Sequence, residues 1–278
     1  MAGILTHSNV MIHPSAIVDP TVELDPGVRI GPFCVVGPNV HIGRDTTLEP
    51  HVTIQPWTTI GPECHISPQA VLGGPPQDSK FKGERSYLII GERTIIREAV
   101  TIHRATGEDQ CTRVGSDCMI MAYCHIGHNC VIGSGVMMAN QVGISGHVIV
   151  EDQVFFGGMI GIHQYVSIGR LAMLGGFSKV VQDVPPFMMV DGRPAEVMQL
   201  NVRGLRRAGL PARVRSALKQ AYKLLYRSDL NLSQAIEAVE NEVEPCEELD
   251  FLLEFLSNIR HGYSGRQKDP NRPRPEEL

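Results

Sequence analysis

An aliphatic residue returns at every sixth position along most of this 278-residue chain, and this period excludes most ordinary folds. An amphipathic α-helix repeats every 3.6 residues and a hairpin strand every two, so neither keeps a six-residue period on one face. A period of six is typical of a parallel β-helix built from hexapeptides. The repeated positions are Ile12, Val18, Leu24, Ile30, Val36, Ile42, Leu48, Ile54, Ile60, Ile66, Leu72, Ile90, Ile96, Ile102, Val114, Ile120, Ile126, Ile132, Met138, Ile144, Val150, Phe156, Ile162, Ile168, Leu174 and Val180.

Two positions of each hexapeptide are predicted to face the interior of the coil. The sixth-place residue points inward, and the residue two before it lies on the same face of a short strand. Three hexapeptides make one triangular coil, and the repeats predict roughly nine stacked coils, about 40 Å tall. The smaller inward position holds five of the seven cysteines, which we interpret as buried thiols rather than disulfides or a metal site: Cys34, Cys64, Cys118, Cys124 and Cys130.

The pattern divides the chain into a prism, a helical domain and a tail. The prism is predicted over residues 1–190, with loops extruded at 73–87 and 103–113, where the period breaks and then resumes in phase. Residues 191–261 are predicted to form a helical domain. The tail, 262–278, is rich in Pro, Arg, Lys and Glu and is predicted to be disordered. Helices are expected over 196–208, 211–227, 231–243 and 245–260.

Charge and hydropathy exclude several classes of function. A net charge of −5 gives no general footprint for nucleic acid. No apolar run approaches the length of a membrane-spanning helix, and no signal peptide precedes the first repeat. The sequence therefore predicts a cytoplasmic protein without membrane insertion.

Histidines gather at outward-facing positions in the second half of the prism. Positions one coil apart stack directly, so His128 is expected beside Gly146, and Gly146 beside Gln164. A glycine N–H without a side chain in front of it can donate to an oxyanion while a neighbouring imidazole acts as a base. The other histidines of this group are His125, His147 and His163.

Less specific interpretations of these features stay open. The two loops are either functional or solvated insertions, and the imidazoles are either a site or a chance surface group. The basic face of the helix expected at 196–208 indicates either an anionic ligand or a solvated surface. Zinc enzymes on hexapeptide prisms use three histidines that include a His-x4-His pair, and no such pair exists here. We therefore expect no metal and no redox cofactor.

Five motifs stand in order along the chain: Gly73–Phe81, Ile96–Arg104, His125–His128, Gln182–Pro186 and Asn201–Arg207. Together they resemble the hexapeptide-repeat family of acyl carrier protein–UDP-N-acetylglucosamine O-acyltransferases, which perform the first step of lipid A biosynthesis. The resemblance covers essentially Met11 to Arg260. It implies an all-β left-handed parallel β-helix followed by a small α-helical C-terminal domain.

The resemblance also implies a reaction and its partners. A homotrimer would hold its active sites between neighbouring prisms. A (3R)-3-hydroxyacyl group would pass from the phosphopantetheine thioester of acyl carrier protein to the glucosamine 3-hydroxyl of UDP-N-acetylglucosamine. The donor carries the phosphopantetheine, so the enzyme itself needs no cofactor.

Individual residues take their roles from the same resemblance. His128 would be the general base, the Gly146 N–H would stabilise the oxyanion, and Gly176 would limit acyl length. The residues implied to bind substrate are Gln77, Asp78, Lys80, His103, His125, His147, His163, Gln164, Asn201 and Arg207.

Three positions depart from the family pattern. Asn129 stands where the best-known members have Asp, Ala208 where they have a second Arg, and Arg203 where they have an acidic residue. An Asn can orient an imidazole but stabilises its charged form less than a carboxylate does. Two alternatives stay open: another hexapeptide-repeat sugar acyltransferase, N-acyl or acyl-CoA dependent, and a non-catalytic prism scaffold.

Overall fold

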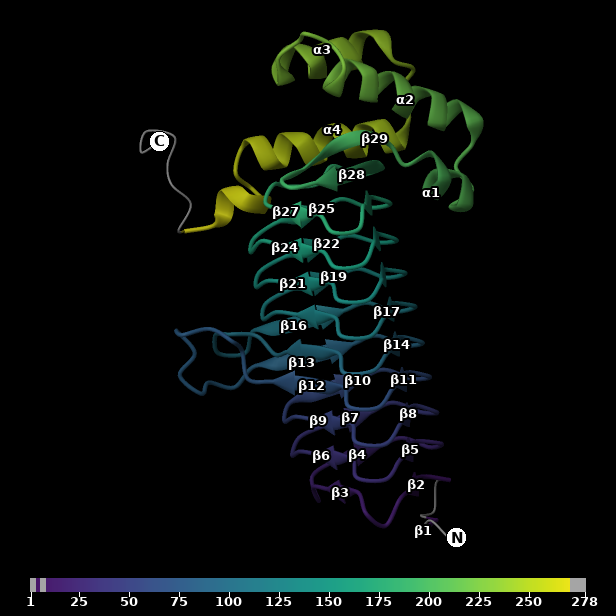
Figure 1. The fold of residues 1–278 in the computed structure, drawn as a ribbon, viewed down its shortest axis with the longest axis vertical. Coiled ribbons are helices and arrows are strands. Elements are labelled where there is room, and N and C mark those ends of the chain that lie inside the picture. Colours follow the sequence, from purple (N-terminus) through teal and green to yellow (C-terminus); the bar gives the residue numbers. More distant parts are fainter. Residues whose placement is uncertain (1–3, 6–8, 271–278) are drawn as a thin grey trace.

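The molecule is a triangular stack of short strands with helices on one end (Figure 1). The computed structural model describes residues 4–5 and 9–270. Met11 pairs with Arg29, and Gly143 pairs with Gly161, so one coil takes eighteen residues, as the sequence predicts. The predicted prism of hexapeptide repeats followed by a helical domain is confirmed.

Within the described residues the strands form three sheets of twelve, nine and eight strands, here named A, B and C. Sheet A contains β1 (Ile4–Leu5), β2 (Met11–Ile12), β5 (Arg29–Ile30), β8 (Thr47–Leu48), β11 (His65–Ile66), β14 (Ile95–Ile96), β17 (Met119–Ile120), β20 (Met137–Met138), β23 (Phe155–Phe156), β26 (Met173–Leu174), β28 (Met188–Gly192) and β29 (Ala195–Leu200). Sheet B contains β3 (Ile17–Val18), β6 (Val35–Val36), β9 (Thr53–Ile54), β12 (Val71–Gly74), β15 (Thr101–His103), β18 (His125–Ile126), β21 (Gly143–Ile144), β24 (Gly161–Ile162) and β27 (Lys179–Val180). Sheet C contains β4 (Glu23–Leu24), β7 (His41–Ile42), β10 (Thr58–Ile60), β13 (Tyr87–Ile90), β16 (Cys111–Val114), β19 (Val131–Ile132), β22 (Ile149–Val150) and β25 (Ser167–Ile168).

The core is a narrow aliphatic column that runs the length of the stack. Sixth-place residues such as Ile42, Ile66 and Ile126 have no exposed surface. The five cysteines at the smaller inward position are buried as well. A single coil is too thin to bury these side chains alone, so each coil depends on its neighbours.

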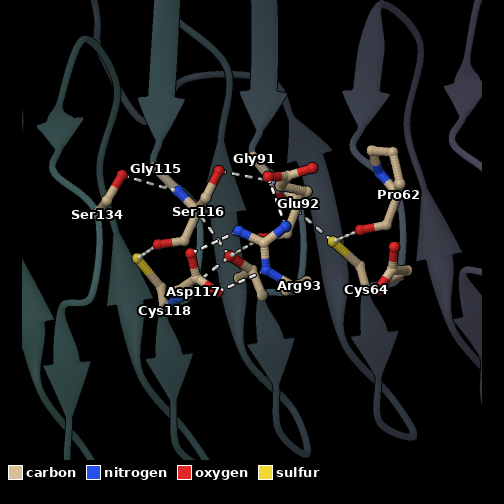
Figure 2. A network of polar contacts seen from close by, with 12 residues as sticks. Pro62, Cys64, Gly91, Glu92, Arg93, Gly115, Ser116, Asp117, Cys118 and Ser134 are labelled. Carbon is tan, nitrogen blue, oxygen red and sulfur yellow. Dashed lines mark hydrogen bonds and ion pairs between the residues drawn. The ribbon is translucent and has the colours of Figure 1, made fainter.

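Polar contacts at one corner of the prism tie successive coils together (Figure 2). The Arg93 guanidinium donates to both carboxylate oxygens of Asp117, at 2.7 and 2.8 Å. The Ser116 hydroxyl accepts the Glu92 N–H at 3.2 Å. These groups are solvated, and exposed ion pairs contribute roughly 0–1 kcal/mol, so the buried column rather than this corner stabilises the stack.

Two loops leave the stack on the same side of the molecule (Figure 1). One joins β12 to β13 over residues 75–86, and the second joins β15 to β16 over residues 104–110. Ile66 pairs with Ile96 and Ile102 with Ile126, so the period resumes in phase after each insertion.

Arg104 fastens the longer loop to the prism. Its side chain lies over the Trp57 ring and the Phe81 ring, 5.2 and 5.4 Å from their centroids. Its Nη1 donates to the Gly73 carbonyl at 3.2 Å. The residue is only 7% exposed, so a planar cation is packed between an aromatic of the prism and one of the loop.

Above the prism lie α1 (Val202–Arg207), α2 (Ala212–Tyr226), α3 (Leu232–Glu242) and α4 (Glu247–Arg260). The capping box at the start of α3 is confirmed, since the side chains of Asn231 and Gln234 each accept the other's backbone N–H. The helix expected over residues 196–208 was wrong in its first half. Residues 195–200 pair with β28 in an antiparallel hairpin, because their alternate side chains cover the last coil.

The tail differs from the disorder expected over 262–278. Residues 262–270 are folded and include a short 3-10 helix, η1 (Gly265–Lys268), while 271–278 lie outside the described residues. An ion pair within this polar segment, between Arg266 and Asp269, and hydrogen bonds from the segment to the prism hold it in place. These contacts cannot be read from composition alone. In the described part of the chain, no helix is both long enough and apolar enough to cross a bilayer.

Candidate active site

A cavity of about 570 Å³ opens along β18, β21, β24 and β27 of sheet B, on the side where the loops project. Seven of the residues singled out in the sequence line it: Gln77, His103, His125, His128, Gly146, His163 and Gln164. The remaining lining residues are Gly127, Gly143, Ile144, Ser145, Gly161, Ile162, Lys179, Val180 and Val181.

His128 and Gly146 lie in direct contact at the turn that leads from sheet B to sheet C. A Cβ added to Gly146 would stand 2.6 Å from His128 Nε2, so no other residue leaves room for this imidazole. Within the described residues, the Gly146 N–H donates to no protein acceptor. The contact therefore places a basic nitrogen next to an available backbone donor.

Asn129 fixes the tautomer of His128. Its Oδ1 accepts the Thr106 N–H at 2.9 Å, and its Nδ2 donates to the Thr106 carbonyl at 3.0 Å, which assigns the two ends of the amide. The same Oδ1 lies 2.8 Å from His128 Nδ1, so Nδ1 must carry the proton. Nε2 is left with its lone pair facing the cavity, as a general base requires.

Burial disfavours the charged form of three other imidazoles near His128. Burial lowers the pKa of His125 to about 4, with added repulsion from His103 and His128. Burial also lowers the pKa of His103, although the Pro75 carbonyl that His103 Nδ1 contacts at 2.7 Å opposes the effect. The pKa of His147 is lowered, first by burial and then by His128.

His147 and Asp78 flank the base without lining the cavity. The His147 ring stands edge-on to His128 and stacks on Tyr165, with centroids 5.1 and 4.5 Å apart. The Lys80 N–H donates to the Asp78 carboxylate at 2.9 Å and is the main cause of the lowered pKa of that carboxyl. His128 also lowers this pKa, so Asp78 lies within electrostatic reach of the imidazole.

Two glycines and a lysine on the cavity floor were missed by sequence reasoning. Gly143 and Gly161 occupy outward positions of β21 and β24, and a Cβ there would meet nothing closer than 3.9 Å. We call these two residues the glycine strip. Lys179 follows in the same column on β27. The eighteen-residue spacing already aligns this column with His125, and that alignment is the signal that could have found all three.

Six predicted residues do not line this cavity: Asp78, Lys80 and His147, described above, and Asn201, Arg207 and Gly176. The Asn201 side chain caps α1, since its Oδ1 accepts the Gly204 N–H and its Nδ2 donates to the Leu171 carbonyl. Arg207 is exposed at the end of α1, which lies on the side of the molecule opposite the loops (Figure 1). Gly176 lies in the turn between β26 and β27, where a Cβ would meet the Gly158 carbonyl oxygen at 3.3 Å.

The histidines of the cavity are not arranged as metal ligands. Among the described residues no group of three or more His, Cys, Asp and Glu side chains could hold a metal ion.

Family models and curated relatives both match this chain. A model described as UDP N-acetylglucosamine O-acyltransferase, domain 2, matches residues 183–264, and the bacterial transferase hexapeptide model matches 39–74 and 111–146. The acyl-[acyl-carrier-protein]–UDP-N-acetylglucosamine O-acyltransferase of Synechocystis sp. is 51% identical over 60% of this chain and 61% of its own length. The protein of the same name from Anaeromyxobacter sp. (strain K) is 44% identical over 68% of this chain and 74% of its own length. The chain belongs to the UDP-N-acetylglucosamine O-acyltransferase family.

Solved members of the O-acyltransferase family share the whole architecture. The Bacteroides fragilis UDP-N-acetylglucosamine acyltransferase is 34% identical, with a TM-score of 0.87 over 89% of this chain and 97% of its own. The Moraxella catarrhalis O-acyltransferase is 40% identical, with a TM-score of 0.85 over 89% of this chain and 96% of its own. The first three curated relatives are matched over only 61 to 65% of their own length.

Proposed function

We propose that this chain transfers a (3R)-3-hydroxyacyl group from acyl carrier protein to the 3-hydroxyl of UDP-N-acetylglucosamine, the first step of lipid A biosynthesis. The names of its relatives support both substrates. The single observation that carries the proposal is the contact between His128 and Gly146. It brings a nitrogen with a free lone pair and an unpaired backbone donor to one point of a cavity.

The chemistry follows from these two groups. His128 Nε2 removes the proton of the sugar hydroxyl as that oxygen attacks the thioester carbonyl. The Gly146 N–H donates to the carbonyl oxygen as it gains negative charge. The C–S bond then breaks, and the imidazolium returns its proton to the leaving thiolate. Asn129 keeps the Nδ1 proton in place throughout, so the same nitrogen acts as base and then as acid.

The floor of the cavity suits the acyl chain. The glycine strip leaves the outer face of β21 and β24 without side chains, so an alkyl chain can lie against the backbone there. Lys179, the first residue of β27, lines this groove. We propose that Gly176, in the turn before β27, lies just beyond its end. Gly176 remains our candidate for the residue that limits acyl length.

We also propose that the chain works as a homotrimer in the cytoplasm. α1, which ends at Arg207, lies on the side of the molecule opposite the loops (Figure 1), and Arg207 does not line the cavity. A phosphate-binding role for Arg207 at this cavity therefore requires a neighbouring subunit. Light scattering should then give a particle of about three times 30.5 kDa. Asn201 is already used as a helix cap, so its part in nucleotide binding stays a prediction.

Replacing His128 tests the function directly. We expect His128→Ala to lower the rate of transfer from 3-hydroxyacyl carrier protein to UDP-N-acetylglucosamine by about 10²- to 10⁴-fold, the usual contribution of a general base. Mass spectrometry of the product gives the rate and the acyl length together. His13→Ala removes an exposed imidazole far from the cavity and serves as the control.

The outcome separates the open alternatives. A scaffold predicts no transfer by the wild-type chain. An acyl-CoA-dependent or N-acylating enzyme predicts transfer only when the donor or the acceptor is changed. Wild-type activity that survives His128→Ala would refute the assignment of the base.

A further inference from the structure

The folded part of the tail lies beside the upper end of the cavity. η1 follows α4 and projects on the same side as the loops (Figure 1). The Arg266 N–H donates to both carboxylate oxygens of Asp183, at 3.0 and 3.1 Å, and Asp183 in turn accepts the Ser167 N–H at 2.8 Å. The tail is therefore hydrogen-bonded to the last coils of the prism, next to β25 and β27.

Two side chains of the tail contact a residue of the cavity wall. Arg266 Nη1 donates to the Gln164 carbonyl at 2.9 Å and to the Asp269 carboxylate at 2.6 Å. The Gln164 amide nitrogen lies 3.4 Å from both oxygens of Asp269. A carboxylate only accepts hydrogen bonds, so it fixes which end of the Gln164 amide faces the tail.

This contact is buried and closely fitted. The Arg266 and Asp269 side chains are 12% and 3% exposed. A Cβ on Gly265 would stand 2.5 Å from the Asp183 carboxylate, and its φ of +77° is one that glycine adopts without strain. A buried charge pair of this kind needs every partner in place, because either ion left alone is destabilising.

The pair also lies close to the reacting groups. Gln164 lines the cavity, and the next residue, Tyr165, stacks on His147, which stands edge-on to His128. Burial is the main cause of the lowered pKa of His147, and the charge of the Asp269 carboxylate opposes it.

We propose that Asp269 and Arg266 are positioning residues for the sugar-nucleotide site, because they hold the Gln164 amide with its oxygen available to the substrate. The inference rests on the function proposed above and adds a part that the family match does not contain. The matching domain model ends at residue 264, so the pair belongs to a segment outside it. Asp269 acts on the substrate only through Gln164.

The decisive variant is Asp269→Asn, which keeps the shape and removes the charge that orients the amide. We expect the KM for UDP-N-acetylglucosamine to rise about 3- to 10-fold, the size expected when one ordinary hydrogen bond to the substrate is lost, with kcat nearly unchanged. Arg266→Lys keeps the charge but loses the planar fork, and should raise the same KM. Lys268→Gln alters an exposed charge in the same 3-10 helix and should leave both constants as they are.

A double-mutant cycle shows whether Asp269 acts through Gln164. If it does, Asp269→Asn adds little to the KM of Gln164→Ala, and the two effects are far from additive. Additive effects, or an unchanged KM in Asp269→Asn, would overturn the inference. A lower melting temperature of Asp269→Asn with an unchanged KM would show that Asp269 only holds the tail in place, and this result would also overturn the inference.

The same experiment keeps the two proposals apart. Wild-type transfer with no effect of Asp269→Asn refutes the positioning role alone. If the wild type shows no transfer, the proposed reaction fails, and calorimetric binding of UDP-N-acetylglucosamine then becomes the readout. Equal affinity of wild type and Asp269→Asn, or no binding by either, overturns the inference in that case.

Discussion

The Asn129 side chain is hydrogen-bonded to the base, His128. It contacts His128 with one amide atom, while both amide atoms bond the backbone of Thr106 in the shorter loop. Its φ of +58° is a left-handed conformation that Asn tolerates better than most residues. The resemblance led us to expect an acidic residue here, and the amide preserves the tautomer without adding charge.

Asn129→Asp tests whether residue 129 acts on His128 by orientation alone, without charge. The carboxylate cannot donate to the Thr106 carbonyl, and its charge favours a protonated imidazole next to it. We expect the acidic limb of the pH–rate profile of kcat/KM to move to higher pH, since the base must lose its proton to act. An unchanged profile, with the rate measured from pH 5 to 9, would show that Asn129 has no electrostatic influence on the base.

Of the contacts around His128, the six-residue spacing of the sequence predicts one and misses another. The contact between His128 and Gly146 follows from the same period that sets the inward-facing residues of the prism, so it could be predicted. The bonds from Asn129 to Thr106 could not, because residues 104–110 leave the repeat and their path depends on packing rather than on period.

Among the elements, the loop over residues 75–86 determines where Gln77 and Asp78 lie. Arg104 attaches it to the prism, through the rings of Trp57 and Phe81. We expect Arg104→Lys to loosen the loop, because an ammonium group cannot stack on both rings and bond the Gly73 carbonyl at once. Limited proteolysis should then cut the loop faster, and transfer activity should fall.

A second arginine at the base of the same loop gives the control. Arg85 pairs with Asp109 at 2.7 Å, but both side chains are more than half exposed. Exposed pairs contribute roughly 0–1 kcal/mol, so Arg85→Lys should leave proteolysis and activity close to wild type. Equal effects of the two substitutions would contradict the anchoring role of Arg104.

Elements outside the repeat were predicted less well than those within it. Met198, Val202 and Leu205 have helical spacing, yet the first of them belongs to β29, because hairpin pairing with β28 overrides local spacing. The composition of the tail predicted disorder, because the segment has few apolar residues to bury. Composition carries no information on a specific contact such as the ion pair between Arg266 and Asp269.

At the scale of the whole molecule, buried imidazoles connect stability to pH. The pKa values of His103, His125 and His147 are all lowered, so the unfolded chain binds protons first as the pH falls. Stability is therefore full above about pH 6.5, the unfolded value, and declines as the pH falls towards about 4. For His125 the effect is at most about 3 kcal/mol, and solvent in the open cavity reduces it.

Thermal melts between pH 7.5 and 5 measure this dependence. We expect the melting temperature to fall over that range, and to fall less steeply in His125→Gln, which cannot gain the proton. The exposed His13→Gln should follow the wild type. A steeper slope in His125→Gln would mean that protonation of this imidazole stabilises the fold, the opposite of what its lowered pKa requires.

Stacked parallel strands present backbone donors and acceptors at both ends, which makes them a template for further growth. In this molecule the twelve-stranded sheet begins with β1 and finishes with β29, and each runs antiparallel to its neighbour. A strand of a second molecule could not continue the parallel pairing of this sheet at either β1 or β29. At this face of the prism the sheet is thereby closed to end-to-end addition of another copy, however regular the interior.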